Sequence, residues 1–215
     1  MRPVNGASAR ATTGQPRYFA IVPAAGRSAR MGQPKLLLPW RGSTVIEHVL
    51  SAWKASRAAR VVVVVHAADQ ALAEVCRRAG AEVVVPAVPP EDMKASVGHA
   101  LRWLTDHAAP GAFDAWLVAP ADMPRLSAAL IDAVIAAHGP DEASILRPVS
   151  NGRRGHPVLF PWTLASAVEK LSADEGLDAL VRRNPVREIA WTDAGTFEDL
   201  DLPADYERLQ REENP

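Results

Sequence analysis

The chain has 215 residues, of which 48% are hydrophobic, and its formal net charge is −1 at pH 7. This length and composition suit a globular protein with one sizeable core. The near-neutral charge argues against nucleic-acid binding, which needs a basic field, and no apolar run approaches the roughly 20 residues that a membrane span requires. The single cysteine, Cys76, cannot form an internal disulfide. We therefore expect a reducing, cytoplasmic setting and a buried thiol on a helix.

The first 17 residues are expected to form a disordered leader. They contain Arg2, Arg10 and Arg17 among Ser, Thr and Gly, with no acidic residue and no apolar stretch. An Arg-rich, acid-poor start also suits an organellar transit peptide, although this segment has no amphipathic face. It lacks the apolar core of a secretory signal.

From residue 18 onward, short apolar runs alternate with helical patterns. Strands are predicted at 18–22, 61–65, 82–85, 116–119 and 143–146, and the second of these is five valines in succession. A helix is predicted to begin at Thr44, which forms a capping box with Glu47, and further helices to cover about 68–79, 96–104 and 127–138. The less regular second half shows an extended segment at 157–160, helical stretches near 162–171 and 175–183, a strand near 186–190 and a helix from Pro203.

This alternation predicts the α/β class, as a three-layer αβα sandwich with a Rossmann-like, mostly parallel sheet. No repeat and no low-complexity linker interrupts the pattern, so we expect residues 18–215 to form a single domain. In such a sheet, ligands bind beyond the carboxyl ends of the strands.

The most informative stretch is 21–35, where an apolar strand runs into a loop of small and cationic residues. Small residues let the backbone approach a ligand, and cations neutralise phosphate charge. The residues concerned are Ala24, Ala25, Gly26, Arg27, Arg30 and Lys35. Their spacing fits neither the Walker loop nor the G-x-G-x-x-G dinucleotide fingerprint. The loop therefore predicts a triphosphate site of another type.

Three further motifs follow in chain order. They are Ala121-Asp122-Met123-Pro124 after a strand, Arg154-Gly155-His156-Pro157, and Asp199-Leu200-Asp201-Leu202-Pro203 before the last helix. Together with the loop's A-A-G-x-x-x-R-M-G-x-P-K pattern, they resemble the MobA-like NTP transferase family over roughly residues 18–210, and within it most closely the molybdenum cofactor cytidylyltransferases. Members transfer a nucleoside monophosphate from an NTP to a phosphorylated acceptor, so the resemblance implies a nucleotidyltransferase of the nucleotide-diphospho-sugar transferase fold.

The resemblance also implies the nucleotide-binding residues. Lys35 would contact the α-phosphate and Arg30 the β- and γ-phosphates, while the backbone of 24–26 cradles the nucleotide. Arg27 either joins the phosphates or faces water. Ser96 would read the base or the ribose, unless it is a helix N-cap. The Ala-Ala-Gly start favours CTP over GTP.

Asp122 and Asp201 resemble the two carboxylates that meet one Mg²⁺. This ion takes one or two carboxylates together with phosphate oxygens. Asp122 alternatively forms a turn, and Asp199, Asp201 and Asp205 alternatively cap the last helix. The six histidines show no metal-ligand spacing, so no zinc site is expected.

The acceptor side is expected in the C-terminal half, while the N-terminal half holds the NTP. There Arg154 and His156 could grip an acceptor phosphate, and their motif resembles that of members handling molybdopterin. Methylerythritol-phosphate and sugar-phosphate nucleotidyltransferases are the alternative enzymes. A nucleotide-binding module without turnover, acting as a partner of a molybdoenzyme or its maturation factor, is the alternative from another class.

Overall fold

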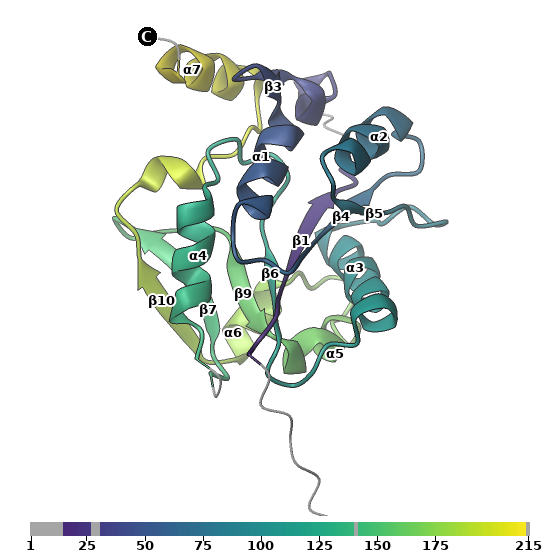
Figure 1. The fold of residues 1–215 in the computed structure, drawn as a ribbon, viewed down its shortest axis with the longest axis vertical. Coiled ribbons are helices and arrows are strands. Elements are labelled where there is room, and N and C mark those ends of the chain that lie inside the picture. The colour runs from purple at the N-terminus through teal and green to yellow at the C-terminus, as the bar shows by residue number, and fades with distance from the viewer. Residues whose placement is uncertain (1–14, 27–30, 140–141, 214–215) are drawn as a thin grey trace, which may run out of the picture.

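The computed structural model describes residues 15–26, 31–139 and 142–213, and its centre is one mostly parallel sheet (Figure 1). Seven strands follow the order β10, β7, β9, β6, β1, β4, β5, and β8 pairs with β7. The strands are β1 (Tyr18–Ala24), β4 (Arg60–Val65), β5 (Glu82–Val84), β6 (Ala115–Val118), β7 (Ile145–Ser150), β8 (Arg153–Arg154), β9 (Val158–Pro161) and β10 (Val186–Ala190). Only the pairings made by β8 and β9 are antiparallel within this sheet of the described chain.

The central strand β1 lies between β4 and β6 and parallel to both. Ala24 is the register partner of Val65, and Ile21 that of Val118. The carboxyl ends of the three strands therefore lie at one edge of the sheet, where the loops that follow them meet. All five valines of β4 are buried, as expected for a strand covered on both faces.

Helices cover both faces of the sheet and complete the three predicted layers (Figure 1). One face carries α1 (Val45–Lys54), α2 (Gln70–Arg78) and α4 (Ala128–Ala137). The other carries α3 (Met93–Ala108), α5 (Ala165–Val168) and α6 (Asp178–Arg183). Alternate side chains of β1 enter the two cores: Ala20 and Val22 pack on the first, Phe19 and Ile21 on the second.

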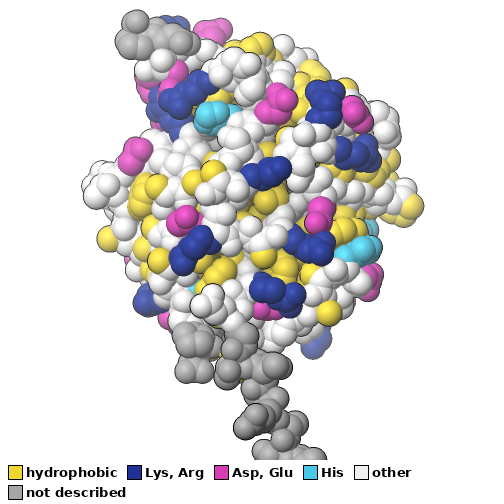
Figure 2. Space-filling model, in the orientation of Figure 1, with side chains coloured by type: hydrophobic (Ala, Val, Ile, Leu, Met, Phe, Trp, Pro, Cys, Tyr) yellow, Lys and Arg dark blue, Asp and Glu magenta, His cyan; other side chains and the backbone are white. Residues whose placement is uncertain are grey.

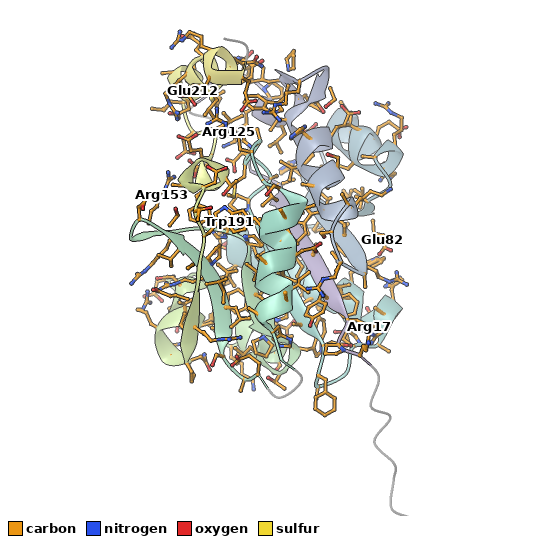
Figure 3. The ribbon with its side chains drawn as sticks, turned by 60° about the vertical axis from the view of Figure 1, so that its left-hand side comes forward. Arg17, Glu82, Arg125, Arg153, Trp191 and Glu212 are labelled. Atoms are coloured by element: carbon orange, nitrogen blue, oxygen red, sulfur yellow. The ribbon has the colours of Figure 1, made fainter. Side chains whose placement is uncertain are left out.

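The remaining elements are the β2–β3 hairpin (Pro39–Trp40 and Ser43–Thr44), the 3-10 helices η2 (Lys35–Leu37), η3 (Trp162–Leu164) and η4 (Ala194–Phe197), and α7 (Pro203–Glu213). The helix α7 and the hairpin lie together at one end of the molecule (Figure 1). The Tyr206 hydroxyl donates to the Pro39 carbonyl at 2.7 Å. Arg125 pairs with Glu212 of α7 at 2.8 Å, and Figure 3 shows the two side by side. These contacts fix α7, and with it the segment that precedes it.

Two local predictions are confirmed. Thr44 and Glu47 form the capping box at the start of α1. Cys76 is buried in α2, and burial raises the pKa of its thiol to about 12, so the thiol is unreactive.

The second half departs from the predicted boundaries. The strand predicted at 143–146 runs from Ile145 to Ser150, because β10 pairs with it along five residues. The helical stretches near 162–171 and 175–183 shorten to η3 with α5 and to α6. Between them, the Ser172 amide donates to the Glu175 carboxylate at 3.0 Å, which stabilises a loop in place of helix.

The chain is already ordered at Arg17. Its backbone N–H donates to the Asp114 carboxylate at 2.8 Å, and its guanidinium forms an ion pair with the same group at 2.7 Å. Arg17 therefore belongs with the folded part rather than with the leader, whose residues 1–14 lie outside the described residues.

Charged side chains of both signs are interspersed over the face shown in Figure 2, in keeping with the net charge of −1. None of the helices in the described part of the chain has the length and apolarity to cross a membrane.

Candidate active site

A cavity of about 720 Å³ opens at the carboxyl edge of β1, β4 and β6. Its wall combines the residues that follow these three strands with the start of α3 and the segment before α7. The residues are Pro23–Gly26, Met31, Lys35, Leu36, His66, Pro89–Met93, Ser96, Pro120–Asp122 and Asp201. The structure therefore brings together Lys35, Ser96, Asp122 and Asp201, which are distant in the sequence.

The loop after β1 supplies backbone to this cavity. Ala24 and Ala25 are buried, and a Cβ atom placed on Gly26 would meet no described atom within 4 Å. Among the described residues, no side chain fills the space beside Gly26. Arg27 and Arg30, both predicted to bind the nucleotide, lie outside the described residues.

Lys35 begins the 3-10 helix η2, directly after Pro34. Its ammonium group forms an ion pair with the Asp122 carboxylate and donates to the Leu200 carbonyl at 2.8 Å. It also lies 3.8 Å from a carboxylate oxygen of Asp201. The Lys35 and Asp122 side chains are each only 15% exposed, so this ion pair is largely shielded from water.

Two aspartates, Asp122 and Asp201, contact the Lys35 ammonium group, and Asp199 lies close to both in the sequence or the fold. The Leu200 N–H donates to the Asp122 carbonyl at 2.9 Å, which places Asp199 and Asp201 beside Asp122. The pKa of the Asp199 carboxyl lies above its usual range, because partial burial and the negative charges of Asp122 and Asp201 disfavour its ionised form. Negative charge is therefore concentrated at this point, as a cation site requires.

The structure shows that Asp205, one of the three aspartates predicted as possible caps of the last helix, contacts the start of α7. The Asp205 carboxylate accepts from the Leu202 N–H at 2.8 Å, so Asp205 is the aspartate that caps the helix. Asp201 faces the cavity.

Asp122 and Asp201 suit a divalent cation. No group of three or more metal-binding side chains occurs among the described residues. Magnesium does not need one, because it is commonly held by one or two carboxylates and completes its shell with phosphate oxygens and water. The two carboxylates and the adjoining open loop match that requirement once a triphosphate is bound.

Ser96 is not the helix N-cap. That role belongs to Asp92, whose carboxylate accepts from the Ala95 N–H at 2.6 Å. The Ser96 hydroxyl donates to the Asp92 carbonyl at 3.1 Å, and the side chain is buried against the cavity wall. Its oxygen lone pairs can still accept a hydrogen bond from a nucleotide.

His66 was missed by the sequence analysis and also lines this cavity. Its Nδ1 accepts from the Ala68 N–H at 3.0 Å, so the neutral ring carries its proton on Nε2 and can donate it. The sequence did contain one indication of this role, because His66 directly follows the five valines of a predicted strand. The Ala24–Val65 register sets His66 beside Ala25.

A second cavity of about 670 Å³ adjoins the first and shares Asp92 and Met93 with it. Both predicted acceptor residues, Arg154 and His156, line it. Its apolar wall contains Val118, Val158, Phe160, Leu177 and Val181. The Arg154 side chain is 69% exposed at the rim, 3.9 Å from Glu188.

His156 is largely buried, and burial holds the pKa of its imidazole below the usual range. Its Nδ1 donates to the Val118 carbonyl at 3.2 Å, because a carbonyl can only accept. In the neutral ring Nε2 is then a hydrogen-bond acceptor. Gly155 is needed beside it, since a Cβ atom there would overlap the Phe197 ring at 2.3 Å.

Arg153 does not belong to either cavity wall, although it neighbours Arg154. Its guanidinium donates to the Phe197 carbonyl at 3.0 Å. Figure 3 shows Arg153 on the same side of the molecule as Trp191, whose indole donates to Thr196 at 3.0 Å. These contacts stabilise the segment that leads to Asp199.

Comparison with known proteins identifies the family to which this fold and site belong. Residues 20–189 match the MobA-like NTP transferase domain. The chain belongs to the MobA-like NTP transferase family. It is accordingly a nucleotidyltransferase, which confirms the predicted class of enzyme. The match contains Lys35, Asp122 and Arg154, whereas Asp201 lies beyond it.

Individual relatives match two thirds or more of the chain. Nicotine blue oxidoreductase of Paenarthrobacter nicotinovorans is 32% identical over 206 residues, which cover 92% of this chain and 98% of that protein. A probable molybdenum cofactor guanylyltransferase of Bacillus cereus is 30% identical over 147 residues, 68% of each chain. The crystal structure of Rv0371c from Mycobacterium tuberculosis has a TM-score of 0.77 and 29% identity, covering 91% of this chain and 98% of that one. Another structure of Rv0371c is a complex with manganese, with a TM-score of 0.74.

Proposed function

We propose that this nucleotidyltransferase transfers CMP from CTP to a phosphorylated pterin, molybdopterin, and releases pyrophosphate in a Mg²⁺-dependent reaction. The observation that carries the proposal is the pair of adjoining cavities with different chemistry. The first offers an open backbone loop, an ammonium group and carboxylates, and the second offers an apolar wall with Arg154 at its rim. A nucleotide in the first and an acceptor in the second would meet near Asp92 and Met93, which line both.

The metal would be held by Asp122 and Asp201. Bound there, Mg²⁺ supplies positive charge to the triphosphate and orients its oxygens. A manganese complex of the related Rv0371c supports a divalent cation in this fold, and the choice of Mg²⁺ belongs to the proposal.

In the transfer step, an oxygen of the acceptor phosphate forms a bond to the α-phosphorus of CTP. The bond from this phosphorus to the bridging oxygen breaks, and its electron pair leaves with pyrophosphate. The acceptor phosphate is already ionised at neutral pH, so no side chain has to remove a proton from it. Lys35 would neutralise the negative charge of the α-phosphate as the electron pair moves to the leaving group.

In the second cavity, His156 and Arg154 would bind different parts of the acceptor. The Nε2 acceptor of His156 suits an N–H group on the pterin ring, and the Val158 and Phe160 side chains suit the ring's flat faces. The exposed Arg154 guanidinium suits the acceptor phosphate, which it can bind with two parallel hydrogen bonds.

The choice of CTP rests on Ala24-Ala25-Gly26, which resembles cytidylyl-transferring members. GTP is the alternative, because the Bacillus cereus relative is named a guanylyltransferase. We also propose that the enzyme works in the cytoplasm, where the unpaired Cys76 stays reduced.

The test measures pyrophosphate release with each of the four NTPs crossed against molybdopterin, methylerythritol phosphate and a hexose 1-phosphate, with Asp122→Asn in parallel. Release that requires CTP, molybdopterin and Mg²⁺, and that Asp122→Asn abolishes, would support the proposal. Release with another pair of substrates would reassign the acceptor or the base.

No release with any pair would favour a nucleotide-binding partner of a molybdoenzyme-maturation factor. Because one relative is named an oxidoreductase, the same preparations are tested for oxidation of reduced nicotinamide cofactors. Substrate-dependent oxidation without pyrophosphate release would overturn the proposed reaction.

A further inference from the structure

The Lys35 ammonium group contacts both of the carboxylates that are proposed to hold the metal ion. It forms an ion pair with Asp122 and lies 3.8 Å from the Asp201 carboxylate. A third contact, to the Leu200 carbonyl at 2.8 Å, holds it against the segment that carries Asp201. The backbone of Lys35 is fixed at the start of η2, but its four-carbon side chain can rotate.

In this arrangement the Lys35 ammonium group supplies the positive charge that balances the two carboxylates, without a metal ion. The Lys35 and Asp122 side chains are each 15% exposed, so water screens their attraction little. A divalent cation that entered beside the ammonium group would meet a like charge at short range. The cation can therefore bind well only if the ammonium group moves away.

Phosphate oxygens would be alternative anionic partners for the Lys35 ammonium group. The loop after β1 lies in the same cavity as Lys35 and is open beside Gly26. A triphosphate bound there would offer Lys35 new anionic partners and would also supply the oxygen ligands that two carboxylates leave unfilled.

We infer that Lys35 is the resident counter-ion of the Asp122–Asp201 pair, and that the divalent cation enters only together with the triphosphate, which draws Lys35 onto its own oxygens. The inference rests on the proposed nucleotide site, but it requires neither CTP nor a particular acceptor. It makes Lys35 the residue that couples metal binding to nucleotide binding, in addition to its role at the α-phosphate.

Equilibrium dialysis against Mn²⁺ tests this coupling without turnover. The amount of Mn²⁺ retained by the protein is measured alone and with inorganic tripolyphosphate, which passes the membrane. We expect the wild type to bind Mn²⁺ at least tenfold more tightly with tripolyphosphate. Lys35→Met should bind Mn²⁺ at least tenfold more tightly than the wild type without tripolyphosphate.

Two controls separate charge from folding. Lys35→Arg keeps the positive charge and should bind Mn²⁺ without tripolyphosphate as weakly as the wild type does. Lys170→Met removes an exposed lysine that is absent from both cavity walls, and should also behave like the wild type. Thermal melting of each variant confirms that it is folded.

Tight Mn²⁺ binding by the wild type without tripolyphosphate, or unchanged binding by folded Lys35→Met, would overturn the inference. Should Lys35→Met prove unfolded, the wild-type and Lys35→Arg titrations decide the question. Tight Mn²⁺ binding by either protein in the absence of tripolyphosphate contradicts a resident counter-ion. Failure of the proposed function is distinguishable, since it would show as absent pyrophosphate release while this metal coupling persists.

Discussion

The backbone N–H of Leu200 donates to the carbonyl oxygen of Asp122 at 2.9 Å and joins the loop after β6 to the segment before α7. Three residues after Asp122, the Arg125 guanidinium pairs with Glu198 at 2.9 Å and with Glu212 at 2.8 Å. Figure 3 shows Arg125 and Glu212 at this junction. The two carboxylate motifs are therefore held together by main-chain and ion-pair contacts, which place Asp201 beside Asp122.

Replacing Asp122 with Asn should abolish metal-dependent transfer and leave the fold intact. The carboxylate follows a buried strand but lines the cavity, so its loss would remove the proposed metal ligand and the Lys35 partner without opening the core. We expect kcat to fall by a factor on the order of 10² or more, as for other electrostatic groups at a reacting phosphate. Steady-state kinetics measure the loss of transfer, and circular dichroism checks that the fold is intact. Near-normal turnover would show that Asp122 is not part of the site.

Asp201 and Asp205 form a matched pair for separating catalysis from helix capping. Asp201→Asn should lose activity, because it removes a carboxylate that lines the cavity, while Asp205 keeps its contact with the Leu202 N–H. Asp205→Ala should keep activity and lose about 1 kcal/mol of stability, typical of a lost cap. The opposite pattern, with a large loss of Tm in Asp201→Asn alone, would make Asp201 structural.

Lys35→Ala should lower kcat much more than it weakens NTP binding. A cation that meets charge developing at the α-phosphate acts mainly in the transition state. Initial rates give kcat, and binding of a non-hydrolysable NTP analogue gives the affinity. A rise in KM with unchanged kcat would identify Lys35 as a ground-state contact instead.

Arg154→Ala should raise the acceptor KM at least tenfold, equivalent to about 1.4 kcal/mol, with CTP affinity nearly unchanged. Arg154 lines the rim of the second cavity, and the substitution would delete the bidentate phosphate contact proposed for it. Arg153→Ala is the matched control, because that guanidinium binds the Phe197 carbonyl outside both cavities, and its acceptor KM should stay near the wild-type value. Collapse of CTP binding in Arg154→Ala would move this segment to the nucleotide site.

Asp199→Asn should raise Tm at pH 7, by an amount on the order of 2 °C for a partly exposed group in a chain of this size. The pKa of Asp199 is raised in the folded state, so the ionised form costs stability. This cost is present above the folded pKa and disappears below the ordinary carboxyl pKa, where both states are protonated. Melting curves should therefore differ between wild type and variant at pH 7 and converge near pH 3, and a lower Tm at pH 7 would contradict the charge crowding described here.

The sequence by itself determined the local structure and the class of chemistry. The five valines of β4 specify a strand buried on both faces, and Thr44 with Glu47 specifies the start of α1, because burial pattern and capping act within one or two turns of the chain. The order of four motifs was enough to identify the family, which the match over residues 20–189 confirmed.

Only the tertiary structure decided which of these residues meet. Lys35, Asp122 and Leu200 are brought together by the placement of β1 beside β6 and by the packing of the α7 segment, and no local pattern encodes that proximity. The same holds for the choice between Asp201 and Asp205 as helix cap, and for the position of His66 beside Ala25. Propensity and spacing act over a few residues, whereas strand order and long-range packing arise from the burial of the whole core, and they alone set the geometry of the site.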